Sequence, residues 1–226
     1  MTQYCAKSLP VQRGPAAWNA ILGPHPPALE LDNDESADFV VVGGGFAGLS
    51  AARRIMQLQP QAKVTVLEAG RIAEGAAGRN SGYMIDLPHD LASDDYAGSG
   101  DDRKMIDLNR QAIGFARNAV EEYRIDPNYF DEVGKVNGAA SVAAEAHNKS
   151  YAQHLASLDE KSEALDPKQM FELTGSRHYI SGLYTPGTVT LQPAGYIRGL
   201  SAGLDAAGVR VYENSPVTGF ARDRAG

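Results

Sequence analysis

The stretch DFVVVGGGFAG, residues 38–48, decides how the chain folds. Its apolar residues 39–42 run directly into three glycines, and Gly48 then opens LSAARRI, a run with helical character. This order predicts a buried strand at 39–42 that is covered on both faces, a tight glycine turn and a helix at 46–58. Free backbone N–H groups and the positive end of the helix dipole make such a turn a cradle for phosphate groups.

The glycines have the spacing of a dinucleotide-binding motif. Gly43, Gly45 and Gly48 fit Gly-x-Gly-x-x-Gly, and Glu68 follows twenty residues after the last glycine. The first glycine permits the tight turn, the second lets backbone approach a pyrophosphate, and the third lets the helix pack on the strand. Glu68 ends a second predicted strand, 64–67, where a carboxylate binds ribose hydroxyls and disfavours a 2′-phosphate. NAD and FAD remain as candidates; a purely structural turn would leave the spacing of Glu68 unexplained.

A second glycine-rich stretch, GAAGRNSG at residues 75–82, follows Glu68. An NAD-binding unit would normally continue into another helix here, whereas this chain has small residues that let backbone pass close to a ligand. Arg79 and Asn80 are able to hydrogen-bond a phosphate or a flavin edge. The stretch taken alone also fits a flexible loop, but its place after Glu68 favours FAD, with NAD as the runner-up.

Both segments resemble a known family. VVVGGGFAGLSAARRI (40–55) and VTVLEAGRIAEGAAGRNSG (64–82) are similar to the D-amino-acid-oxidase-like FAD-dependent oxidoreductases, which include glycine and sarcosine oxidases. The similarity is greatest to the γ-glutamylputrescine oxidase branch of that family. LYTPGTVTLQP (183–193) and GLDAAGVRVYENSPVTGF (203–220) also resemble the matching stretches, so the resemblance covers roughly residues 36–226.

The resemblance implies an α/β fold with two domains. A glutathione-reductase-type, Rossmann-like FAD-binding domain takes residues 36–100 and 193–226 and is incomplete. A second, partly present α+β substrate domain takes residues 101–192. Residues 1–35 contain five prolines, which disfavour helix and strand, and are expected to form a surface arm. The alternative for the arm is that Trp18 and Tyr4 reach a substrate channel or a partner subunit.

Local patterns predict the remaining elements. Apolar spacing, Asp166 as an N-cap and a proline at the first position of the last helix predict four helices. They are 101–124, with an apolar stripe of Met105, Leu108, Ile113, Ala116 and Val120, then 143–158, 167–173 and 193–207. Strands are predicted in 130–142, in 182–191 around the turn Pro186-Gly187, and in 209–212 and 216–220.

The resemblance also implies which residues bind the cofactor. The glycine turn and first helical residues hold the pyrophosphate, Glu68 holds the adenosine ribose, the 79–81 segment lines the pyrophosphate and flavin side, and backbone at Val217 binds adenine. The set is Gly43, Gly45, Phe46, Ala47, Gly48, Glu68, Arg79, Asn80, Ser81 and Val217. One departure is Ala77, where the family often has serine, but the small size is kept.

The implied reaction is FAD-dependent oxidation of an amine or amino acid. A hydride passes from the carbon next to nitrogen to flavin N5, the imine is hydrolysed, and oxygen or another acceptor takes the electrons. One alternative is a flavin dehydrogenase that passes electrons to a quinone or carrier, and another is a non-catalytic FAD-binding fragment or subunit. Catalytic residues are not assigned. Tyr83 and Tyr184 are aromatic candidates for a substrate pocket, although buried tyrosines usually serve packing.

Composition limits the partners. The net charge of −7 with scattered basic residues argues against nucleic-acid binding. The five histidines have no metal-ligand spacing, so no metal site is expected. No segment is long and apolar enough to span a bilayer, no signal peptide is visible, and Cys5 is the only cysteine, which fits a cytoplasmic setting. Because family members continue well past residue 226, the chain is expected to be truncated or completed by a second chain.

Overall fold

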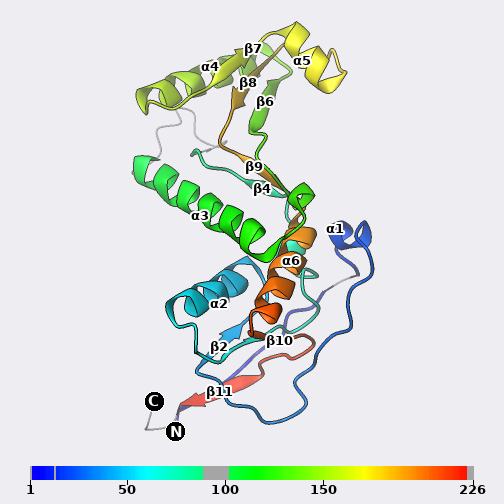
Figure 1. Ribbon diagram of the computed structural model, residues 1–226. Coiled ribbons are helices and arrows are strands. Elements are labelled where there is room, and N and C mark those ends of the chain that lie inside the picture. Colours follow the sequence, from blue (N-terminus) through cyan, green and yellow to red (C-terminus); the bar gives the residue numbers. More distant parts are fainter. Residues whose placement is uncertain (1, 13, 89–101, 223–226) are drawn as a thin grey trace. The chain divides into compact units, whose positions relative to one another are not determined.

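The computed structural model describes residues 2–12, 14–88 and 102–222, which fall into two compact units (Figure 1). Unit 1 comprises residues 1–82, 119–129 and 192–226, and unit 2 comprises 83–118 and 130–191. The first unit boundary therefore lies at Gly82, where the second glycine-rich stretch ends, whereas the domain division expected from the sequence lay at residue 100. The N-terminal arm and the 119–129 segment also belong to unit 1.

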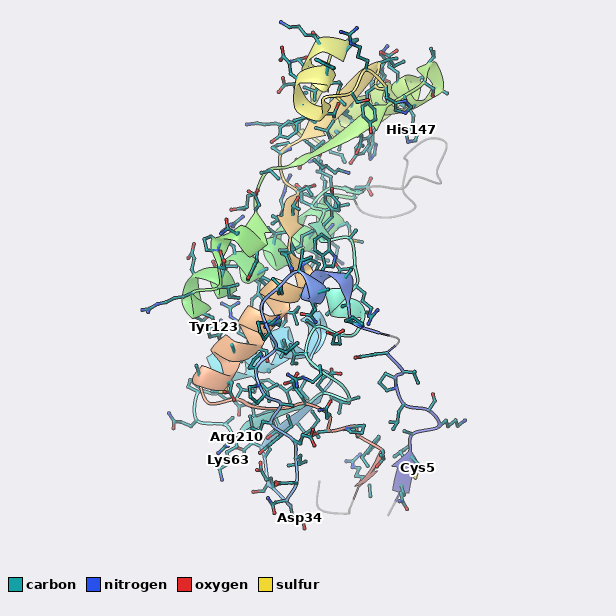
Figure 2. The ribbon with its side chains drawn as sticks, turned by 90° about the vertical axis from the view of Figure 1, so that its right-hand side faces the viewer. Cys5, Asp34, Lys63, Tyr123, His147 and Arg210 are labelled. Atoms are coloured by element: carbon teal, nitrogen blue, oxygen red, sulfur yellow. The ribbon has the colours of Figure 1, made fainter. Side chains whose placement is uncertain are left out.

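Unit 1 is built on a parallel sheet with the strand order β10-β3-β2. Its strands are β2 (Phe39–Val42), β3 (Val64–Leu67) and β10 (Arg210–Tyr212). Figure 2 shows Lys63 and Arg210 side by side where β3 and β10 begin. Helices α2 (Phe46–Leu58) and α6 (Pro193–Ala206) pack against each other and against this sheet. The 3-10 helices η1 (Ala76–Gly78) and η2 (Pro127–Tyr129) contact α6.

The segment from β2 to β3 confirms the prediction from residues 38–68. Both strands and α2 have the predicted bounds, and Leu49 and Ala52 of α2 are fully buried. Arg53 on the same helix is 2% exposed and pairs with Glu122 at 2.6 Å. A buried guanidinium is tolerated because its charge is paired and hydrogen-bonded.

The prediction that β2 is covered on both faces is wrong. Val40 and Val42 have exposed fractions of 56% and 65%. Alternate residues of a strand point to opposite faces, so these two valines share one face. β2 also lies at the edge of the three-stranded sheet, and the described residues leave that face of β2 open.

The N-terminal arm contains more regular structure than its prolines predict. Strand β1 (Thr2–Cys5) pairs antiparallel with β11 (Gly219–Arg222), and a short helix α1 (Ala17–Ala20) follows. β11 begins three residues later than the strand predicted at 216–220. The five arm prolines lie outside β1 and α1, as their missing N–H groups require.

Unit 2 contains two antiparallel sheets. One has the order β4-β9-β5, with β4 (Tyr83–Met84), β9 (Val189–Leu191) and β5 (Phe130–Asp131). The other has the order β6-β8-β7, with β6 (Lys135–Ala139), β8 (Ser181–Thr185) and β7 (Glu163–Leu165). The strand–turn–strand predicted at 182–191 is present, but β8 and β9 belong to different sheets, so the segment joins the sheets and is not a hairpin.

Three helices complete unit 2: α3 (Asp102–Tyr123), whose last residues enter unit 1, α4 (Val142–Ser157) and α5 (Pro167–Thr174). Asp166 caps α5 as predicted, in a capping box with Gln169. The stripe predicted on α3 is wrong at two positions, because Met105 and Leu108 are about half exposed and Ile106 is buried instead. The core cluster consists of Leu87, Ile106, Tyr151, Leu155 and Leu183.

We expect Leu155→Ala to lower the free energy of unfolding by about 3 kcal/mol, because Leu155 is fully buried in this cluster and its removal leaves a cavity. Val142→Ala on the same helix is the control; Val142 is 76% exposed and its truncation should change stability by less than about 0.5 kcal/mol. Denaturant unfolding measures both, and equal losses would contradict the described core.

Candidate functional site

The glycine turn of unit 1 has the geometry that its sequence predicts. Gly43 has a φ of +99°, which L side chains rarely adopt, and its N–H donates to the carbonyl of Leu67 at 2.9 Å. A Cβ at Gly48 would overlap the carbonyl oxygen of Gly43, so only glycine lets α2 start this close to the turn. Gly45 is the N-cap of α2, and no described side chain caps that end. Its first-turn N–H groups are therefore not taken up by a side-chain cap.

Glu68 binds this turn with one carboxylate oxygen and the start of the second loop with the other. Oε2 accepts from the N–H of Gly44 at 2.8 Å, and Oε1 accepts from the N–H of Gly70 at 2.9 Å. A carboxylate has about four lone-pair sites, so these two bonds leave acceptor capacity. The structure thus brings the acid at the end of β3 together with the phosphate-binding turn. This combination suits a ribose next to a pyrophosphate.

The second glycine-rich stretch approaches the same turn. A Cβ at Gly45 would lie 3.6 Å from Cβ of Ala77. Ala77 is the position where the sequence departs from the resembled family, and its small size keeps this approach open. A Cβ at Gly78 would overlap the carbonyl oxygen of Ala73, so the 3-10 helix η1 also requires close backbone packing.

Arg79 and Asn80, which follow η1 and are predicted to contact the cofactor, hydrogen-bond other parts of the protein in this structure. The Arg79 guanidinium donates to the carbonyls of Glu74 at 2.7 Å and Gly14 at 2.5 Å, and lies 3.7 Å from the Glu74 carboxylate. The Asn80 side chain donates to the carbonyl of Ala77 and accepts from the N–H of Gly82, which closes the loop. Ser81 is exposed. Arg79 and Asn80 therefore fix the loop shape, and their contact with a cofactor stays a proposal.

The segment just before Val217 is bonded to the backbone of Glu68 and Gly70. The N–H of Ser215 donates to the carbonyl of Glu68 at 2.9 Å, and the N–H of Asn214 donates to that of Gly70 at 2.8 Å. Val217 is half-buried and precedes β11, so its backbone lies outside the strand predicted there. This segment runs beside the acid expected to bind ribose.

Two acidic residues that the sequence reading missed organise the same region. Glu74 accepts from the N–H of Ala16 at 2.6 Å and from Asn19 Nδ2 at 2.8 Å. Glu213, which is 8% exposed, accepts from the N–H of Ile72 at 2.6 Å and from Arg71 Nε at 3.1 Å. The partners of both lie far away in sequence, so no local pattern marks them.

Unit 2 holds a pocket of about 650 Å³ that both tyrosine candidates line. In the sheet β6-β8-β7, Val136, Tyr184 and Glu163 are direct cross-strand neighbours, so they share the face that borders the pocket. Tyr83 reaches the pocket from β4. The lining is mainly apolar and aromatic, and its polar positions are Lys135, Asn137, Glu163 and Thr190.

Glycines shape this pocket. The Tyr184 ring lies over Gly134, where a Cβ would be 2.6 Å from a ring carbon, and the Tyr184 hydroxyl donates to the carbonyl of Val133 at 3.2 Å. Met170 of α5 packs on Gly138 and Gly182 and covers the neighbouring part of the same sheet face. The pocket is thus the part of this face that α5 leaves open.

The described residues contain neither a cluster of metal ligands nor a helix able to span a membrane. Within residues 2–12, 14–88 and 102–222, no three His, Cys, Asp or Glu side chains gather as metal ligands. His147, labelled in Figure 2, lies on α4. None of the helices in the described part of the chain is long and apolar enough to cross a bilayer.

Comparison with known proteins places these features in context. Residues 38–226 match the family model DAO, described as FAD dependent oxidoreductase. The chain is 28% identical over 200 residues to the probable oxidoreductase OrdL of Haemophilus influenzae, covering 85% of this chain and 44% of that protein. It is 30% identical over 202 residues to gamma-glutamylputrescine oxidoreductase of Escherichia coli, covering 83% and 44%. The chain thus spans less than half the length of these relatives.

Solved structures share the fold. Glycine oxidase from Bacillus cereus superposes with a TM-score of 0.64 at 18% identity, covering 79% of this chain and 46% of that one. L-amino acid deaminase from Proteus vulgaris gives a TM-score of 0.64 at 16% identity, covering 84% and 43%. The α/β fold expected from the sequence is that of FAD-dependent oxidases and dehydrogenases.

Two glycine substitutions separate folding from ligand approach. We expect Gly48→Ala to lower the free energy of unfolding by about 3 kcal/mol, because the added methyl overlaps backbone. We expect Gly45→Ala to leave stability within about 0.5 kcal/mol, because its methyl meets only Ala77 at an ordinary contact distance, yet to weaken dinucleotide binding about tenfold or more. Denaturant unfolding and ligand titration measure the two effects; a Gly45→Ala variant that binds like wild type would contradict pyrophosphate approach at this turn.

Proposed function

The chain belongs to the family of FAD-dependent oxidoreductases, and from this we propose that it serves the FAD-dependent oxidation of an amine or amino acid. The observation that carries the proposal is Glu68, whose carboxylate bonds the glycine turn at Gly44 and the start of the second loop at Gly70. This arrangement offers a ribose acceptor beside a phosphate cradle. This chain spans less than half the length of its relatives, so the activity of the whole protein is a proposal.

The residues of unit 1 fit the adenosine half of FAD. We assign the pyrophosphate to the backbone from Gly43 to Gly48, where glycines keep the approach open and the start of α2 offers N–H groups. Glu68 accepts from the ribose hydroxyls, and backbone at Val217 faces the adenine. The loop containing Arg79, Asn80 and Ser81 forms the wall toward the flavin. FAD, when bound, supplies the electron acceptor for oxidation of the carbon–nitrogen bond.

We assign the pocket of unit 2 to the substrate. Its apolar and aromatic wall excludes water and orients the carbon skeleton, with Tyr83 and Tyr184 as the aromatic contacts. The Glu163 carboxylate attracts the ammonium group of an amine or amino acid at neutral pH. Oxygen or another acceptor takes the electrons onward. A cytoplasmic setting is part of the proposal, in keeping with the exposed free thiol of Cys5.

A second candidate, an FAD-binding subunit that needs another polypeptide segment for activity, is supported by β2. The exposed valines Val40 and Val42 form an apolar face on an edge strand of parallel type. Parallel sheets are normally covered on both faces. Another polypeptide segment that packs on Val40 and Val42 would bury this face, which the described residues leave exposed.

The cofactor assignment is tested by colour. Purified chain mixed with FAD and desalted should keep a flavin absorbance band near about 450 nm, the ordinary band of the isoalloxazine ring. NAD added in excess should not displace it. A folded chain that stays colourless contradicts FAD binding by this chain, and displacement by NAD would favour the runner-up cofactor.

Substitution of the ribose acid gives a quantitative test. We expect Glu68→Ala to weaken FAD binding by about 1–3 kcal/mol, the scale of a lost charge-assisted hydrogen bond. Glu172→Ala is the control, since that side chain is 62% exposed on α5 of unit 2. Titration of flavin fluorescence measures both dissociation constants. Equal affinities would show that the acid at residue 68 does not bind the ribose.

A further inference from the structure

The N-terminal arm lies outside the region that matches the family model, which begins at residue 38. It nevertheless belongs to unit 1. Figure 1 shows its chain in blue, running from α1 to the start of β2. Many of its hydrogen bonds go to two places, and others go to Arg71, Ile72 and Arg198. Each of the two places contains or adjoins a residue to which we assign a cofactor contact.

The first place is the loop from residue 73 to 80. Glu74 accepts from the N–H of Ala16 and from Asn19 Nδ2, and Asn19 Nδ2 also lies 3.1 Å from the carbonyl of Ala73. Asn19 is 8% exposed, so these bonds are shielded from water and hold the arm firmly.

Trp18 binds the loop of residues 79–81, to which we assign the wall toward the flavin. Its indole N–H donates to the carbonyl of Asn80 at 2.8 Å, and its own carbonyl accepts from Gln192 Nε2 at 2.8 Å. Gly14 accepts from Arg79. The arm therefore binds backbone or side chain of Glu74, Arg79 and Asn80 in one short stretch.

Gln12 places a side chain on the glycine loop itself. A Cβ at Gly70 would lie 3.0 Å from both Nε2 and Oε1 of Gln12, and one at Gly75 would lie 3.6 Å from Nε2. The absence of side chains at residues 70 and 75 thus makes room for the arm. Gly70 is also the residue whose N–H binds Glu68.

The second place is the segment after β10. The N–H of Leu31 donates to Ser215 Oγ at 3.0 Å, and the carbonyl of Leu29 accepts from the N–H of Glu213 at 2.8 Å. Asn214 Nδ2 donates to Glu30 Oε1 at 2.8 Å. Ser215 in turn binds the backbone of Glu68, so the arm is anchored on both sides of the proposed ribose acid.

From these contacts we infer that residue 12 and residues 14–35 form a strap of the cofactor site. The strap fixes the 70–80 loop and the 213–215 segment in the shape that receives FAD, which removes ordering cost from binding. By linkage, FAD bound to that shape also holds the strap down. Glu74 is its positioning residue, because it joins Ala16, Asn19 and Arg79. The inference rests on the proposed function and extends it to a segment outside the family match.

The test uses the full chain and two readouts besides activity. We expect Glu74→Gln, which removes the charge, to raise the FAD dissociation constant about tenfold. We expect Trp18→Phe, which removes the indole N–H and keeps an aromatic ring, to raise it about threefold. Glu172→Gln on α5 is the matched control and should bind as wild type. Thermolysin cleavage between residues 20 and 31, where Ile21 is 72% exposed, should slow several-fold when FAD is added to wild type and less in Glu74→Gln.

Each outcome decides. Weaker binding in both variants with FAD-dependent protection in wild type supports the strap. Wild-type affinity in both variants, with cleavage unaffected by FAD, overturns it and leaves the proposed function standing. A wild-type chain that takes up no FAD contradicts the proposed function and the strap together. If Glu74→Gln fails to fold, Trp18→Phe alone carries the comparison, because it removes the indole N–H and keeps a smaller aromatic ring at this partly buried position.

Discussion

The structure of unit 1 depends on one close approach, that of the first turn of α2 to the carbonyl oxygen of Gly43. No side chain fits between them, so residue 48 must be glycine. This approach places the start of α2 next to the turn. Glu68, which follows β3, binds the same turn at Gly44. The positive end of a helix and a carboxylate acceptor then lie together, which is the pairing that a dinucleotide requires.

Local pattern was sufficient for this part of the fold. Glycine spacing, an apolar run and an acid at the right distance predicted β2, α2, β3 and the position of Glu68 beside the turn, because each depends on local sequence. Asp166 was predicted as a cap for the same reason. Burial was predicted less well. Val40 and Val42 are apolar yet exposed, because exposure depends on which other segments cover the sheet.

Long-range contacts account for what the sequence did not reveal. Glu74 bonds residues more than fifty positions away, and no motif announces such a partner. β8 and β9 flank a recognisable turn but enter different sheets, and buried Asp86 packs against Gly187 in that turn. The tyrosines of the pocket were named as candidates from residue type alone. It was the strand register that placed Tyr184 with Val136 and Glu163 on one face.

The central claim is that this chain holds the adenosine half of FAD through the turn, α2 and Glu68. Competition measures it most directly: FAD bound to the purified chain is titrated with ADP, which carries the adenosine and both phosphates, and separately with FMN, which carries the flavin and one phosphate. We expect ADP to displace FAD and FMN to displace it far more weakly. Displacement by FMN with no effect of ADP would contradict the account, because binding would then depend on groups other than this cradle.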